Sequence, residues 1–130
     1  MSELKRPRIL IVDDDEWILD ALKRQLHSRY EVTTATGGLE AMKLVMSQPP
    51  YAVVVCDLRM PGIDGVTLLY LIRQAAPDTV RVLLTGQADV ESASSAVNQG
   101  NIFRFLIKPC SSGMLFRALE AAVEQYRQKR

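Results

Sequence analysis

The chain has 130 residues, of which 48% are hydrophobic and 24% are charged, and its formal net charge is +1. This length fits one compact domain and is too short for two ordinary ones. The near-neutral charge gives no reason to expect a nucleic acid or a membrane as the main partner, and no apolar run reaches the roughly 18 residues of a transmembrane helix. The two cysteines lie far apart without metal-binding spacing, so we expect reduced thiols and a cytoplasmic protein.

Five short apolar segments alternate with segments of helical periodicity. Three of the apolar segments are almost continuously apolar, which is typical of strands that are buried on both faces of a parallel sheet. After the first of the five, Ile18, Leu22 and Leu26 recur at helical spacing. The alternation predicts an α/β fold of the (βα)5 type, a doubly wound parallel sheet of five strands with helices on both faces. The expected strands are residues 9–12, 30–35, 52–56, 80–84 and 102–107.

Residues that favour helix ends occur where these helices should begin or stop. Asp64 and Asp89 can cap helix N-termini, and Gly100 can end a helix. Asp14 and Asp15 both precede the first helical segment, so either of them can cap it. The expected boundaries of the helices therefore agree with their periodicity.

Polar residues follow four of the five expected strands. Asp13 and Asp14 follow the first, Asp57 the third, Thr85 the fourth and Lys108 the fifth. Because the carboxyl ends of parallel strands meet at one rim of a sheet, we expect these side chains to lie close together. Carboxylates that close repel one another unless a cation lies among them, and oxygen ligands alone favour Mg²⁺. The rim therefore predicts a Mg²⁺ site beside a position for a phosphoryl group.

Four segments end the corresponding strands in the order ILIVDDDE, VVVCDLRMPGIDG, VRVLLTGQAD and FRFLIKP. Together they resemble the receiver domain of bacterial two-component response regulators, and the resemblance covers essentially the whole chain. It implies a single receiver domain over residues 1–130 and a flavodoxin-like sheet with strand order 2-1-3-4-5. It also implies a sensor histidine kinase as the phosphoryl donor.

The resemblance implies a role for each residue at the rim. Asp57 would accept the phosphoryl group, and Lys108 would contact that group. Asp13 and Asp14 would bind Mg²⁺ with Asp57, helped by the backbone carbonyl of Arg59. A carboxylate can form a covalent aspartyl phosphate, and this transfer needs in-line placement and positive charge more than it needs an acid or a base.

The resemblance also implies how the domain signals. Thr85 would be the switch hydroxyl, and the aromatic switch position falls on Phe105, although Phe103 has the same strand parity. The responding face would comprise the helix 89–98, the strand through Phe105 and the helix that begins near Met114. This face would contact an effector domain, a downstream protein or a second phosphorylated copy of the chain.

Three further expectations follow from the same resemblance. Arg59 and Gln87, which lie two residues beyond Asp57 and Thr85, would tune the lifetime of the phosphate. The bond between Lys108 and the next residue, a proline, would be cis. The domain would catalyse only its own phosphorylation and dephosphorylation and would not otherwise be an enzyme.

Two other functions fit parts of the sequence. Asp13 and Asp15 have the spacing of haloacid-dehalogenase-type phosphatases, with Asp13 as the nucleophile, but Trp17 does not match that pattern and Asp57 is left without a role. A flavodoxin-like cofactor binder is the second alternative, although an acidic first turn repels a phosphate group unless a metal intervenes. The segment GNIFRFLIKP resembles receivers fused to cyclic-dinucleotide phosphodiesterase domains, but these residues do not specify the output.

Overall fold

The computed structural model describes residues 6–47 and 50–129. Strands and helices alternate through the described chain, as the sequence predicts. A 3₁₀ turn, Gln87–Asp89, leads into the fourth helix. In chain order the elements are β1 (Arg8–Val12), α1 (Glu16–Leu26), β2 (Glu31–Ala35), α2 (Gly38–Ser47), β3 (Val53–Asp57), α3 (Gly65–Ala75), β4 (Val80–Thr85), α4 (Val90–Asn98), β5 (Arg104–Ile107) and α5 (Ser112–Gln128).

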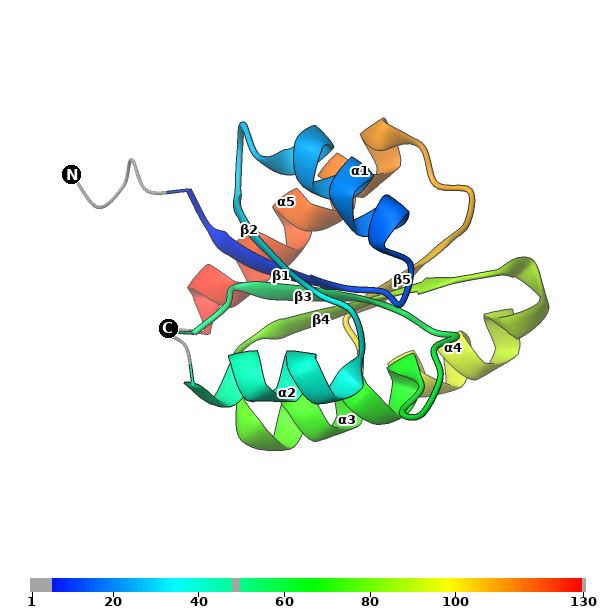
Figure 1. Cartoon of the computed structure of the whole chain (residues 1–130). Coiled ribbons are helices and arrows are strands. Elements are labelled where there is room, and N and C mark those ends of the chain that lie inside the picture. Colours follow the sequence, from blue (N-terminus) through cyan, green and yellow to red (C-terminus); the bar gives the residue numbers. More distant parts are fainter. Residues whose placement is uncertain (1–5, 48–49, 130) are drawn as a thin grey trace.

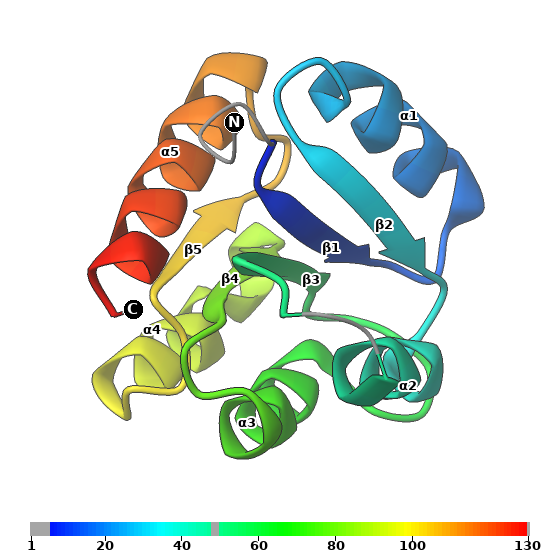
Figure 2. The same cartoon turned by 90° about the vertical axis from the view of Figure 1, so that its left-hand side faces the viewer.

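The five strands form one parallel sheet in the order β2-β1-β3-β4-β5, which confirms the predicted topology. Helices α1 and α5 cover one face of the sheet, and α2, α3 and α4 cover the other (Figures 1 and 2). Every strand runs in the same direction, so all five carboxyl ends lie along one rim. No helix in the described part of the chain is long and apolar enough to cross a membrane.

Alternate residues of the central strands fill two cores. In β1, Ile9 and Ile11 pack on the side of α1 and α5, whereas Leu10 and Val12 pack on the side of α2, α3 and α4. All five residues of β3 are buried because helices cover both faces of the sheet. Cys56 is one of them and is a free thiol, as is the half-buried Cys110.

Two strand ends differ from the prediction in ways that matter for the site. Strand β3 extends one residue further than expected, so Asp57 is the last residue of a buried strand. Strand β5 begins at Arg104, two residues after the expected start. Phe103 therefore precedes the strand and packs on the α1 and α5 side, while Phe105 packs on the opposite side, against the core that includes α4. The two aromatic side chains were expected on the same face of the strand, but they lie on opposite faces of the sheet. Only Phe105 lies in β5, beside α4.

Candidate functional site

Three carboxylates meet at the rim where β1 and β3 end. Oxygen atoms of Asp13, Asp14 and Asp57 all lie within 4.8 Å of one another. The Asp13 and Asp57 residues are only 3% and 5% exposed, and Asp14 is exposed. Because the three donors are oxygens and one side of the cluster is open to solvent, this arrangement fits Mg²⁺, which binds carboxylates and keeps several waters.

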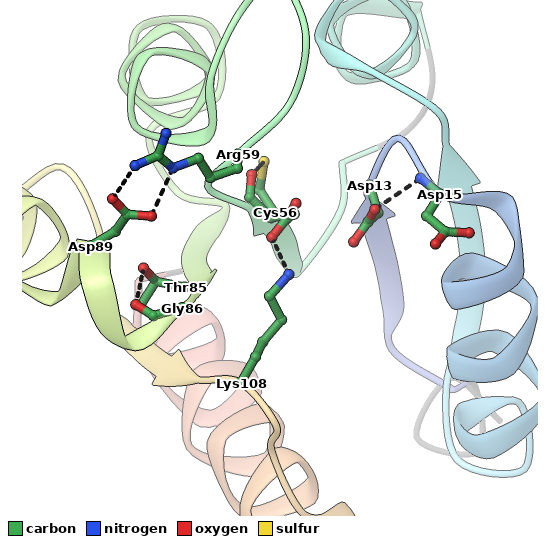
Figure 3. Close-up of polar contacts among 9 residues, drawn as sticks. Asp13, Asp15, Cys56, Arg59, Thr85, Gly86, Asp89 and Lys108 are labelled. Atoms are coloured by element: carbon green, nitrogen blue, oxygen red, sulfur yellow. Dashed lines mark hydrogen bonds and ion pairs between the residues drawn. The ribbon is translucent and has the colours of Figure 1, made fainter.

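A backbone hydrogen bond fixes the first carboxylate of the cluster. The Asp15 backbone N–H donates to Asp13 Oδ1 over 2.9 Å (Figure 3). Asp15 also caps α1, since its own Oδ1 accepts from the Trp17 N–H at 2.9 Å. Of the two alternatives for the cap, Asp15 is thus the correct one, and Asp14 belongs to the acidic cluster. Burial raises the pKa of Asp13, and the nearby Asp57 charge raises it further.

A lysine supplies positive charge to the third carboxylate. Lys108 Nζ lies 2.6 Å from Asp57 Oδ1, in an ion pair between side chains that are 39% and 7% exposed (Figure 3). The Lys108 backbone N–H donates to the Thr85 carbonyl at 2.8 Å and so places the residue just past the end of β5. The Lys108–Pro109 bond is cis, as the resemblance implied.

Thr85 ends β4 at the same rim. It is fully buried, and its Oγ1 donates to the Gly86 carbonyl over 3.1 Å. The Asp89 backbone N–H donates to the same carbonyl, also over 3.1 Å. Gln87 lies in the intervening 3₁₀ turn and is exposed. The Thr85 hydroxyl therefore makes its hydrogen bond to the loop that leads from β4 to α4.

The side chain of Arg59 lies on this loop. Its Nε and Nη2 donate to the two carboxylate oxygens of Asp89 at 2.8 and 2.6 Å (Figure 3). These hydrogen bonds hold the pKa of Asp89 below its ordinary value. Asp89 occupies the N-cap position of α4, as predicted, but its side chain makes no capping hydrogen bond. A bidentate bond to a guanidinium is stronger than a bond to a backbone N–H, which explains the difference.

A glycine that the sequence analysis missed shapes the loop after Asp57. Gly65 is the first residue of α3, and its N–H donates to the Leu58 carbonyl at 2.8 Å. A Cβ atom on Gly65 would lie 2.4 Å from the Asp57 carbonyl oxygen and 2.8 Å from Leu58 Cα. Asp64 caps the same helix through the Thr67 N–H, as predicted. The available signal was the second glycine of PGIDG, directly after the capping residue.

We expect Gly65→Ala to lower the free energy of unfolding by about 1–3 kcal/mol, because the added methyl group meets backbone atoms that cannot move independently of Asp57. The matched control is Gly113→Ala, which is also in the first turn of a helix and meets only Arg117 Nη2 at 4.0 Å. That control should leave the stability unchanged or raise it by up to about 1 kcal/mol. Urea denaturation of both variants checks the prediction, and equal stabilities would contradict it.

This fold and this rim define a known class of signalling domain. The family described as response regulator receiver domain matches residues 9–120. The chain therefore belongs to the response regulator receiver domain family of two-component systems. This membership supports neither the haloacid-dehalogenase-type phosphatase nor the flavodoxin-like cofactor binder.

Proteins with similar sequences or structures carry several different names. It is 36% identical over 120 residues to the hydrogenase transcriptional regulatory protein HoxA of Cupriavidus necator, covering 92% of this chain but only 25% of HoxA. A solved structure named adenylate cyclase from Rhodopirellula baltica is 41% identical, with a TM-score of 0.92 and coverage of 93% of this chain and 90% of that one. The signal receiver domain of an HD domain-containing protein from Pseudomonas fluorescens is 37% identical, with a TM-score of 0.88 and coverage of 95% and 99%.

Proposed function

We propose that this domain is a phosphorylation-dependent switch that accepts a phosphoryl group on Asp57 from a sensor histidine kinase in a Mg²⁺-dependent reaction. The observation that carries the proposal is the setting of Asp57 at the end of buried β3. Lys108 Nζ lies 2.6 Å from its carboxylate, and oxygens of Asp13 and Asp14 lie within 4.8 Å. The match to the receiver domain family, over residues 9–120, includes all four of these residues and supports the proposed roles.

The proposed reaction needs little covalent machinery. A carboxylate oxygen of Asp57 attacks the phosphorus, a new P–O bond forms, and the P–N bond to the donor histidine breaks with its electron pair remaining on the imidazole nitrogen. The Lys108 ammonium stabilises the negative charge on the transferring phosphoryl oxygens. Asp13, Asp14, Asp57 and the Arg59 carbonyl would hold Mg²⁺, which supplies further positive charge there when bound.

The output of the switch would be a change in the face formed by α4, β5 and α5. Thr85 would turn its hydroxyl from the Gly86 carbonyl to a phosphoryl oxygen, and Phe105 would move with the loop. An effector domain, a downstream protein or a second copy of the chain would bind the altered face. The proteins similar to this chain carry differing names, so the fold does not specify which effector is used.

The domain would catalyse no reaction except its own phosphorylation and dephosphorylation, and Arg59 and Gln87 would tune how long the phosphate lasts. We also propose a single receiver domain over residues 1–130 and a cytoplasmic location, which agrees with the free thiols of both cysteines.

The proposal can be tested by incubating the protein with a small phosphodonor such as phosphoramidate. Intact mass should rise by one phosphoryl group when Mg²⁺ is present, and EDTA should suppress the increase. The modification should be removed by hydroxylamine, as expected for an acyl phosphate. A hydroxylamine-resistant product, or equal labelling with EDTA, would contradict the proposal.

Asp14→Ala should weaken Mg²⁺ binding by about tenfold or more, because it removes one ligand oxygen and one negative charge, and loss of even an outer partner commonly costs tenfold. Calorimetry can measure this, together with the fluorescence of Trp17, which is 85% exposed beside the cluster. Glu16→Ala is the matched control, since Glu16 is an exposed acid two residues away but outside the cluster. Equal affinities for the two variants would contradict the metal assignment.

A further inference from the structure

The geometry points to Asp89 as a positioning residue for Arg59, which it holds until Asp57 carries a phosphoryl group. In the unphosphorylated protein, Asp89 holds the Arg59 side chain at the 3₁₀ turn that leads into the first turn of α4. When Asp57 is phosphorylated, Arg59 leaves Asp89 for the phosphoryl oxygens, and the first turn of α4 is released. This inference rests on the proposed function, because it requires the phosphoryl group to be on Asp57.

The contact between the two residues joins two loops of the rim. Arg59 follows β3 and Asp89 follows β4, and the residues are 30 positions apart in sequence. Both carboxylate oxygens of Asp89 accept from the guanidinium, at 2.6 and 2.8 Å. The Asp89 side chain is only 15% exposed, whereas that of Arg59 is 75% exposed. Asp89 is thus the fixed member of the pair, and Arg59 is the member that solvent surrounds.

Arg59 can change partners without moving its backbone. Its neighbours Leu58 and Met60 are buried at 7% and 9% exposure. The Leu58 N–H also donates to the Leu84 carbonyl at 2.9 Å, which continues the pairing of β3 with β4 beyond Asp57. The Arg59 backbone is therefore anchored two residues from Asp57, while its long side chain is mostly in solvent and is held, among the described residues, only by Asp89.

Asp89 is connected to the proposed switch hydroxyl as well. The Gly86 carbonyl accepts both from Thr85 Oγ1 and from the Asp89 N–H, each at 3.1 Å. If Thr85 turns to the phosphoryl group, this carbonyl loses one of its two donors. The same event that attracts Arg59 therefore also loosens the turn that holds Asp89.

The charges favour an exchange of partners. A phosphoryl group adds a charge of roughly −1.5 to −2 close to the anchored Arg59 backbone and offers several acceptor oxygens. A single carboxylate competes with that group for the same guanidinium. Arg59 thereby supplies positive charge to the phosphate only after the transfer has occurred.

Separate hydrogen bonds hold the C-terminal end of α4. Loss of the Arg59 contact should therefore loosen only the first turn of this helix. The Arg81 guanidinium is buried and its Nε donates to the Asn101 carbonyl at 2.8 Å. The Asn101 N–H in turn donates to the Ala96 carbonyl at 3.0 Å. We therefore expect the amides near Ala96 to be insensitive to the Arg59 contact.

The first test uses the unmodified protein and measures amide hydrogen exchange. Arg59→Gln and Asp89→Asn should each speed the exchange of amides in the first turn of α4 by about two- to fivefold, the factor expected for loss of an exposed ion pair. The double variant should exchange no faster than the faster single variant. Glu91→Gln is the control: it removes an acid from the first turn of α4 without breaking the Arg59 contact, so it loses only the helix-dipole interaction and should speed exchange less than Asp89→Asn does. A parent-like Asp89→Asn variant, or additive effects in the double variant, would overturn the inference.

The second test adds beryllofluoride and Mg²⁺ as a mimic of the phosphoryl group. Asp89→Asn should bind the mimic about two- to fivefold more tightly than the parent, because Arg59 no longer has to leave a partner. Arg59→Gln should not bind it more tightly, since the variant lacks both the restraint and the new contact. A merely structural ion pair would shift both variants equally, and that result would overturn the inference. Asp89→Glu retains the carboxylate and should restore the parent affinity.

The two tests separate this inference from the proposed function. Failure of the parent protein to bind the mimic would refute both the phosphoryl site at Asp57 and the exchange of partners that depends on it. Binding of the mimic at Asp57 with parent-like exchange and affinity in Asp89→Asn would leave the proposed function intact and refute the role of Asp89 alone.

Discussion

Asp57→Asn should abolish phosphorylation by small phosphodonors, with the initial rate reduced by at least about a thousandfold. The amide is a poor nucleophile, and knocking out the attacking residue of an enzyme commonly costs this much or more. The substitution should not unfold the domain, because it removes one of three clustered carboxylates and so reduces their mutual repulsion. The rate loss should therefore be a chemical effect.

Asp64→Asn is the matched control for this experiment. It makes the same change of charge in the loop that follows β3, and asparagine caps a helix as well as aspartate does. The control should be phosphorylated at close to the parent rate, measured as intact mass against time. If Asp57→Asn still gains a phosphoryl group at a rate similar to that of Asp64→Asn, another residue is the acceptor.

Thr85→Ala should separate phosphorylation from signalling. Asp57, Lys108 and the acidic cluster remain, so phosphoryl transfer should still occur. Without the hydroxyl, the active state loses one charge-assisted hydrogen bond, worth roughly 1.5–3 kcal/mol. That loss corresponds to about a tenfold to hundredfold smaller shift of a two-state equilibrium toward the active state.

Amide chemical shifts with and without beryllofluoride measure this second effect. The parent should show changes across α4, β5 and the start of α5, whereas Thr85→Ala should bind the mimic with a much smaller response on that face. Thr85→Ser keeps the hydroxyl and should respond like the parent. A complete parent-like response in Thr85→Ala would show that Thr85 is not the switch.

The fold could be predicted because its cause lies in local sequence patterns. Strands covered on both faces are almost continuously apolar, and the helices show one apolar side, so the order of elements is readable residue by residue. The start of β5 was less predictable. The apolar run begins at Ile102, but pairing with β4 begins only at Arg104. Strand boundaries depend on partners that the run itself does not reveal.

The acidic cluster and Lys108 could be predicted because parallel strands deliver their carboxyl ends to one rim. The ion pair of Arg59 with Asp89 could not, since it joins side chains 30 residues apart and depends on rotamers in two loops. Local rules placed Asp89 correctly at the start of α4, but a stronger tertiary contact with Arg59 replaced the expected side-chain capping bond. Gly65 was missed because its need for a bare Cα arises from the path of the Asp57 backbone.

The most direct measurement is to locate the phosphoryl group on the chain. The protein is phosphorylated with phosphoramidate and Mg²⁺, the acyl phosphate is reduced with borohydride, and peptide mass spectrometry identifies the aspartate that has become homoserine. We expect the conversion at Asp57 alone. Conversion at Asp13 with Asp57 unchanged would contradict the proposed function and would favour the phosphatase-type nucleophile instead.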